Sequence, residues 1–123
     1  MENNVYTELG KNIIAVLPKN WERVCLYAQI SKDSCEFFFY VKIGDKYINC
    51  FDLEKSYGIS RKELREKFKE LHGLLSPDQK EKNWYVLTFI LNSDGKFSVE
   101  YEYTDYSENS LNYQRIWKEK YLK

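Results

Sequence analysis

The sequence predicts an α+β fold: a single antiparallel sheet of about five strands with helices packed on one face, in the order α-β-β-β-α-β-β-α. Three observations predict it. Five segments show the alternating or continuously apolar pattern of β-strands, and three others repeat apolar residues at helical spacing. Short connections join neighbouring strands, which favours antiparallel pairing. The strands are grouped apart from the helices, which is typical of α+β proteins.

Length and composition indicate one domain spanning residues 1–123. A chain of 123 residues supports one hydrophobic core rather than two. It is 43% hydrophobic and 31% charged with zero net charge, which disfavours both a disordered chain and a generally basic nucleic-acid-binding protein. The N-terminus lacks the pattern of a signal peptide, and no apolar run approaches the roughly 20 residues that span a bilayer. We therefore expect a cytoplasmic protein without membrane contact.

The first half of the chain predicts one helix and three strands. Residues 2–17 repeat apolar residues on one helical face, and Pro18 ends this helix because the residue before a proline is pushed out of the α region. A turn is expected at residues 32–34, and Gly44-Asp45 predicts a hairpin turn. The three strands are expected at residues 21–31, 35–43 and 46–53.

The second half begins with the clearest helix in the sequence. Ser60 and Glu63 form a capping box. Residues 61–75 then place apolar side chains on one face and charges on the rest. Ser76-Pro77 either ends this helix or begins a short second one with proline in its first turn.

Two strands and a helix complete the predicted fold. Residues 84–92 are apolar on both faces and are therefore expected inside the sheet. Asp94-Gly95 is the strongest hairpin signal in the sequence, and residues 97–103 form the partner strand. Its inward side chains are expected to be Phe97, Val99, Tyr101 and Tyr103, and its outward ones Glu100 and Glu102. A last helix at about residues 110–121 carries Tyr113, Trp117 and Tyr121 along one track.

One face of the predicted sheet is expected to be open, because all helices are placed on the other. Tyr27, Phe38 and Tyr40 would project from it. Aromatic residues are favoured at protein interfaces, so this face is a candidate interaction surface. Aromatic sheets also read single-stranded RNA, but they need a basic groove, and Glu100 and Glu102 argue against one.

The cysteines and the single histidine predict neither a metal site nor a catalytic centre. Cys25, Cys35 and Cys50 form no C-x-x-C pair, so structural zinc is disfavoured, and we expect buried or half-buried free thiols on strands in a reducing compartment. His72 is expected at the boundary of a helix. No cofactor is expected.

The most unusual stretch is "FSVEYEYTDYSEN", which alternates aromatic and acidic residues. Residues 92–110 carry five acids against one lysine, Lys96, a local net charge of −4, and residues 111–123 carry four basic residues against one acid, a local net charge of +3. Glu100 and Glu102 share one face of a strand, with Cα atoms roughly 7 Å apart. Such a pair can hold Mg²⁺ or hydrolyse glycosides, but no other segment marks an enclosing pocket. Docking is therefore favoured over catalysis, and plain solvated surface remains the alternative.

Four pieces of the sequence carry a resemblance to a known family: "VLPKNWERVCLYAQIS", "FFFY", "WYVLTFILNSDGKFSVEYEYTD" and "RIWKEKYL". With them, nearly the whole chain resembles the YezG-like immunity proteins, antitoxins of LXG-type polymorphic toxins in bacterial competition. This chain has Asn83 where related sequences often have proline. The resemblance implies a non-enzymatic inhibitor that binds the toxic C-terminal domain of a secreted toxin, often a nuclease, inside the producing cell.

The acidic stretch is the candidate binding site for such a toxin, because a nuclease is basic where it grips phosphate. The acids would supply charge and the tyrosines would act as anchors; the set is Glu100, Glu102, Tyr103, Asp105, Tyr106 and Glu108. We expect no direct contact with nucleic acid. The alternative is a general protein- or nucleic-acid-binding module without a toxin, motivated by local net charges of +2 in residues 61–91 and +3 in residues 111–123. Whether the protein is a monomer or a homodimer is left open.

Overall fold

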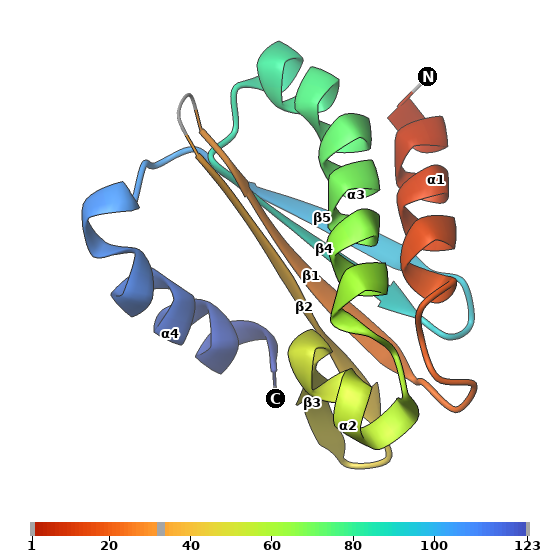
Figure 1. Cartoon of the computed structure of the whole chain (residues 1–123). Helices are drawn as coiled ribbons and strands as arrows, with labels where there is room; N and C mark the ends of the chain where they lie inside the picture. The colour runs from red at the N-terminus through yellow and green to blue at the C-terminus, as the bar shows by residue number, and fades with distance from the viewer. Residues whose placement is uncertain (1, 32–33, 123) are drawn as a thin grey trace.

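The computed structural model describes residues 2–31 and 34–122, so the turn expected at residues 32–34 lies mostly outside the described residues. Figure 1 shows one sheet with helices beside it. In chain order the elements are α1 (Glu2–Ile14), β1 (Arg23–Ile30), β2 (Cys35–Ile43), β3 (Lys46–Asn49), the 3₁₀ turn η1 (Cys50–Asp52), α2 (Leu53–Tyr57), α3 (Arg61–Lys82), β4 (Val86–Asn92), β5 (Phe97–Glu102), η2 (Ser107–Asn109) and α4 (Ser110–Tyr121).

The predicted α+β fold with a five-stranded antiparallel sheet is confirmed. The strand order is β3-β2-β1-β4-β5, and every neighbouring pair is antiparallel. β1 lies at the centre, where Tyr27 is opposite Phe38 of β2 on one side and Thr88 of β4 on the other. β4 lies inside the sheet, as its continuous apolar run predicts.

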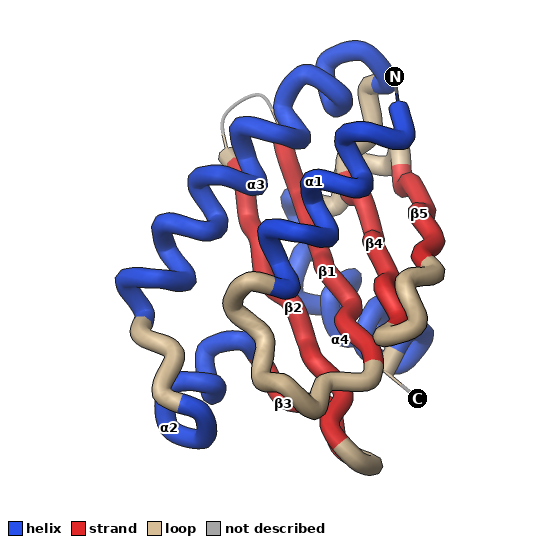
Figure 2. Tube along the Cα trace, turned by 90° about the vertical axis from the view of Figure 1, so that its right-hand side faces the viewer, coloured by secondary structure: helices blue, strands red, loops and turns tan. Residues whose placement is uncertain are grey.

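Helices cover both faces of the sheet, which corrects the expectation that they pack on one face. α1 and α3 lie side by side on the first face, and α4 crosses the second (Figures 1 and 2). The aromatic side chains that were expected on an open face require cover, since each large ring left in water forgoes its burial energy. Trp117 of α4 supplies it, with its ring centroid 5.4 Å from that of Tyr27 and 5.6 Å from that of Phe38.

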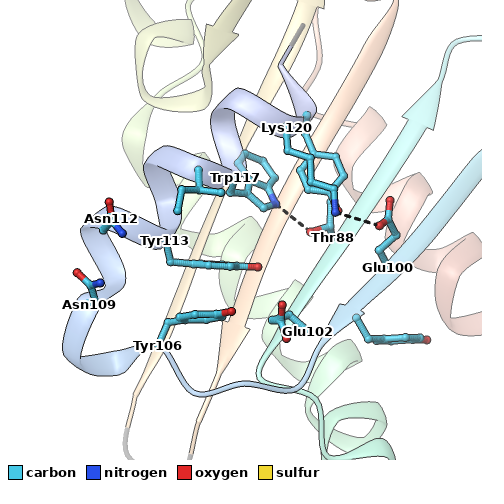
Figure 3. Close-up of a pocket in the computed structure, with 12 residues that line it drawn as sticks. Thr88, Glu100, Glu102, Tyr106, Asn109, Asn112, Tyr113, Trp117 and Lys120 are labelled. Atoms are coloured by element: carbon cyan, nitrogen blue, oxygen red, sulfur yellow. Dashed lines mark hydrogen bonds and ion pairs between the residues drawn. The ribbon is translucent and has the colours of Figure 1, made fainter.

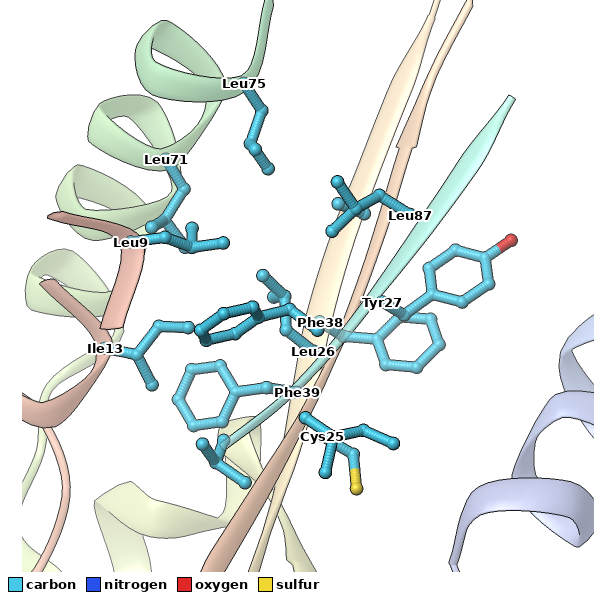
Figure 4. Close-up of a cluster of buried hydrophobic side chains, with 14 of the residues drawn as sticks. Leu9, Ile13, Cys25, Leu26, Tyr27, Phe38, Phe39, Leu71, Leu75 and Leu87 are labelled. Atoms are coloured by element: carbon cyan, nitrogen blue, oxygen red, sulfur yellow. The ribbon is translucent and has the colours of Figure 1, made fainter. Parts of the chain in front are cut away.

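The larger part of the core lies between the first face and α1 with α3. Alternation along each strand sends every second side chain to this face, and Figure 4 shows them meeting the helices while Tyr27 points the other way, toward α4. Fully buried members of this layer include Leu9, Ile13, Leu26, Phe39, Leu71, Leu75 and Phe89. The helical periodicity of α1 and α3 therefore predicted their buried faces correctly.

α3 is longer than the sequence predicted. It begins at the expected cap, where the backbone N–H of Glu63 donates to Ser60 Oγ at 3.1 Å, but it continues through Pro77 to Lys82. Proline inside a helix removes one backbone hydrogen bond and costs about 3 kcal/mol. Buried side chains on both sides of it, Leu75 and Asp78, hold the helix against the sheet. Asn83 ends it at φ 60, a conformation that proline, fixed near −65°, cannot adopt.

The third strand is shorter than expected, because residues 50–57 are helical rather than extended. Asn49 ends β3, and its side-chain oxygen accepts a hydrogen bond from the backbone N–H of Phe51 at 2.9 Å. Such a local cap turns the chain out of the sheet. The expected connection at residues 54–60 is partly α2, which Gly58 ends in the left-handed conformation at φ 76.

The cysteines differ from one another in exposure. Cys25 and Cys50 are buried, whereas Cys35 is exposed and Cys50 lies in η1 rather than on a strand, so two parts of the expectation are wrong. Burial raises the pKa of the Cys25 thiol to about 11 and that of Cys50 to about 12. Both are therefore protonated and unreactive near neutral pH.

This difference gives a simple test of the fold. A disulfide reagent such as Ellman's reagent should react rapidly with one thiol of the native protein at pH 7.5, and with all three after denaturation. The variant Cys35→Ser should lose the rapid phase entirely, while Cys50→Ser keeps it. Rapid reaction of two or more native thiols would contradict the burial of Cys25 and Cys50.

Among the residues that the structure describes, no helix has the length and apolarity to cross a membrane.

Candidate functional site

A cavity of about 270 Å³ lies beside α4, where the helix leaves part of the second sheet face uncovered (Figure 3). Its floor is β4 and β5, and its wall is the chain from Tyr106 through α4. The aromatic wall is formed by Tyr106, Tyr113, Trp117 and Tyr121, and two carboxylates face it, Glu100 and Glu102. The cavity therefore combines an aromatic wall with negative charge.

The position of the two carboxylates follows from the register of β5. Glu100 is opposite Thr88 of β4 and Glu102 is opposite Val86. Both side chains project from the face that α4 crosses, on the outward side that the sequence predicted, and there they line the cavity. On the other face of β5, Tyr101 meets Tyr6 of α1, and their hydroxyl groups form a hydrogen bond.

Glu102 also determines where β5 ends. Its Oε2 accepts hydrogen bonds from the backbone N–H groups of Tyr103 at 3.0 Å and Thr104 at 3.2 Å. These bonds turn the chain away from β4 and hold the carboxylate in place. Tyr103 consequently lies outside the strand and is 60% exposed, which corrects the expectation that it faces inward.

The aromatic wall is ordered by ring contacts. The rings of Tyr106 and Tyr113 stack with centroids 4.1 Å apart and an interplanar angle of 11° (Figure 3). The indole Nε1–H of Trp117 donates to Thr88 Oγ1 at 2.9 Å, which fixes α4 to the sheet. Burial raises the pKa of Tyr113, and the negative charge of Glu102 raises it further. The Tyr113 hydroxyl therefore stays neutral near neutral pH.

One basic side chain of this chain already reaches the cavity. Lys120 Nζ lies 3.8 Å from Glu100 Oε1 and 5.2 Å from the centroid of the Tyr121 ring (Figure 3). The lysine and glutamate side chains of this pair are 63% and 52% exposed, so the pair contributes little to stability.

The structure brings together only half of the residues that the sequence placed in the site. Glu100, Glu102 and Tyr106 line the cavity, whereas Tyr103, Asp105 and Glu108 are exposed outside it. The sequence did not place α4 at this site. The pattern that could have indicated its role is the track of Tyr113, Trp117 and Tyr121, whose spacing of four puts them on one helical face.

A second hollow, near the start of β2, is more open. It has a volume of about 470 Å³ and is lined by Cys35, Phe37, Arg65, Phe68, Lys69 and His72. Cys35 and His72 make no hydrogen bond with each other among the described residues, and His72 Nε2 lies 3.4 Å from Ser76 Oγ. His72 is half-buried on α3, as expected of a boundary residue.

The arrangement at α4 and β5 suits the binding of a positive group more than it suits a reaction. Within residues 2–31 and 34–122, no group of three or more His, Cys, Asp or Glu side chains is placed to hold a metal ion. Carboxylates facing aromatic rings attract cations by charge and by the ring quadrupole. The chain is thus a small α+β protein with an acidic, aromatic-walled cavity suited to a positively charged group.

The chain belongs to the YezG-like immunity protein family, whose model, described as "Immunity protein YezG-like", matches residues 2–123. It is 31% identical over 118 residues to "Immunity protein YezG" of Bacillus spizizenii, covering 89% of this chain and 73% of the relative. It is 28% identical over 134 residues to "Immunity protein YezG" of Bacillus subtilis, covering 97% and 86%. It is also 27% identical over 130 residues to "Type VII secretion system protein EsaG" of Staphylococcus aureus, covering 98% and 78%.

Proposed function

We propose that residues 1–123 act as one immunity domain, which binds and neutralises the toxic C-terminal domain of a cognate LXG-type toxin in the cytoplasm of the producing cell. The toxic domain is a nuclease, and the inhibitor acts by occupying its surface without catalysis. Membership of the YezG-like immunity family supports the class. The acidic, aromatic cavity between α4 and β5 is the observation that supports this type of partner.

Electrostatics supports a nuclease as the partner. A nuclease has basic side chains where it binds phosphate. An acidic surface on the inhibitor both covers these side chains and accelerates association. The acids of the proposed surface are Glu100, Glu102, Asp105 and Glu108. The exposed Tyr103 and the half-buried Tyr106 lie among them, and tyrosine is a common anchor of protein interfaces.

Reversing three charges tests this surface. We expect the variant Glu100→Lys, Glu102→Lys, Asp105→Lys to bind the toxin domain encoded beside this protein roughly 30- to 100-fold more weakly, because attraction becomes repulsion. Dissociation constants would be measured by calorimetry at two salt concentrations, with protection of growth in co-expression. The matched control is Asp45→Lys, Glu66→Lys, Glu81→Lys, which changes net charge equally at exposed positions away from the cavity.

Two results of this experiment distinguish a wrong binding surface from a wrong function. Equal affinity of both triple variants, with the fold retained, would contradict the proposed surface. Absence of binding and protection by the unmodified protein would contradict the immunity function for that toxin.

The alternative function, a general or nucleic-acid-binding module, has weaker support. The positive charge of residues 111–123 was one reason to consider nucleic-acid binding. Arg115 Nη1 lies 2.9 Å from Glu119 Oε1, and Lys120 lies near Glu100, so part of that charge is balanced locally. Salt-sensitive, micromolar binding to RNA or DNA would favour the alternative, and its absence at low salt would exclude it.

A further inference from the structure

We infer that the cavity between α4 and β5 receives one arginine side chain of the toxin domain, whose guanidinium lies between the Tyr106–Tyr113 rings and the carboxylates of Glu100 and Glu102. This inference rests on the proposed function for the identity of the partner. The chemistry of the cavity can be tested without the toxin.

The size of the cavity favours a single side chain. Sites for drug-sized ligands usually measure about 300–1,000 Å³, and this one measures about 270 Å³. Its opening lies between α4 and the edge strand β5, where a side chain projecting from a docked protein can enter. Tyr103 directly follows Glu102 of the cavity lining in the chain. Its side chain is exposed and can contact a docked protein outside the cavity.

The walls fit the shape of a guanidinium. The stacked rings of Tyr106 and Tyr113, with centroids 4.1 Å apart, cover each other's faces and point their hydroxyl ends toward Glu102 (Figure 3). This wall therefore offers hydroxyl oxygens, which accept hydrogen bonds from the edge of a guanidinium. Asn109, on the same side of the cavity as these rings, adds a side-chain amide oxygen that can accept a hydrogen bond (Figure 3).

The carboxylates of Glu100 and Glu102 can accept hydrogen bonds from the edge of the same guanidinium. Glu102 is held by two backbone N–H groups that bind Oε2, at 3.0 and 3.2 Å, which leaves Oε1 as an acceptor. Glu100 lies two residues away on the same strand face. A guanidinium carries five donors in a fixed fork and can bridge two acceptors at this spacing, whereas an ammonium is a single point of charge.

The chain's own Lys120 shows that the cavity attracts cations, and it also competes for the site. Its Nζ is 3.8 Å from Glu100 Oε1, longer than a hydrogen bond, and both side chains are largely exposed. Such a pair is weak enough to be displaced. Entry of arginine therefore requires Lys120 to move aside, and removing its charge should strengthen binding.

The test is an NMR titration of the isolated protein with N-acetyl-arginine amide. We expect a saturable shift of the Trp117 indole N–H signal at millimolar concentration, and none with N-acetyl-citrulline amide, which has the same shape without the charge. Glu102→Gln should weaken binding roughly tenfold, because it removes a charge-assisted hydrogen bond. Lys120→Gln should tighten it about two- to fivefold. Glu66→Gln, at an exposed acid of α3 away from the cavity, is the matched control and should change nothing.

Three results would overturn the inference: equal shifts with the citrulline compound, no saturable shift with arginine, or no tightening in Lys120→Gln. Each variant would first be checked for an unchanged backbone spectrum. With the toxin, Glu102→Gln should lower affinity about tenfold. Loss of arginine binding with unchanged toxin affinity would overturn this inference alone. Failure of the unmodified protein to bind the toxin would instead overturn the proposed function.

Discussion

Replacing Trp117 with alanine is expected to lower the free energy of unfolding by about 3–5 kcal/mol. Trp117 is only 2% exposed, and its ring packs against Tyr27 at the centre of the sheet. Its ring meets Tyr27 at an interplanar angle of 89°, an edge-to-face geometry that adds to the energy of burial. The substitution also leaves Thr88 Oγ1, buried in the sheet, without its donor.

Urea denaturation followed by circular dichroism would measure this effect. The control is Leu111→Ala on the same helix, where the side chain is 83% exposed and the change should stay within about 0.5 kcal/mol. A loss below about 1 kcal/mol for Trp117→Ala would contradict the packing of α4 on the second sheet face, because cavity formation around a buried tryptophan costs more.

The second large effect is expected at Asp78, a buried carboxylate of α3 that is only 7% exposed. Its Oδ2 accepts a hydrogen bond from Trp84 Nε1–H at 3.1 Å, and its Oδ1 lies 3.1 Å from Lys82 Nζ. Lys82 in turn donates to the hydroxyls of Tyr6 and Tyr101, which joins α3 to α1 and β5. Asp78→Ala should therefore destabilise the fold by about 3 kcal/mol, since it leaves the buried indole N–H of Trp84 without its acceptor and removes the carboxylate that pairs with the Lys82 ammonium.

Two further variants separate the contributions at Asp78. Asp78→Asn keeps an acceptor for the Trp84 indole and loses only the ion pair, so a loss of about 1 kcal/mol is expected. Glu81→Ala, at an exposed position of the same helix, should be near neutral. Equal stability of Asp78→Ala and Glu81→Ala would show that the network around Lys82 does not stabilise the protein.

Local signals predicted most of the elements, because their physical causes are local. The alternation of β1, the capping residue Ser60 and the turn at Asp94-Gly95 each act within a few residues. The sequence failed where distant residues decide. Ser76-Pro77 was expected either to end the helix or to begin a short second one, but buried side chains on both sides of Pro77 hold one continuous helix to the sheet. Asn49 ends β3 through a side-chain cap that the strand pattern of residues 46–53 did not indicate.

The candidate site was predicted in part for the same reason. The pairing of Glu100 with Glu102 on one strand face follows from alternation along β5. What covers that face depends on where α4 docks, and this depends on contacts between residues far apart in the chain, such as Trp117 with Tyr27. The aromatic track of α4 and the aromatic face of β1 and β2 were both visible in the sequence. The sequence did not indicate that these two aromatic surfaces pack against each other.

The docking of α4 has a consequence for how the protein is made. All five strands precede α4 in the chain, so a nascent chain on the ribosome can complete the sheet while Tyr27 and Phe38 are still uncovered. Such a species exposes an apolar surface that chaperones recognise and that promotes aggregation. Chains interrupted before α4 should therefore accumulate as aggregates or be degraded, so that release of soluble protein depends on translation continuing past Trp117.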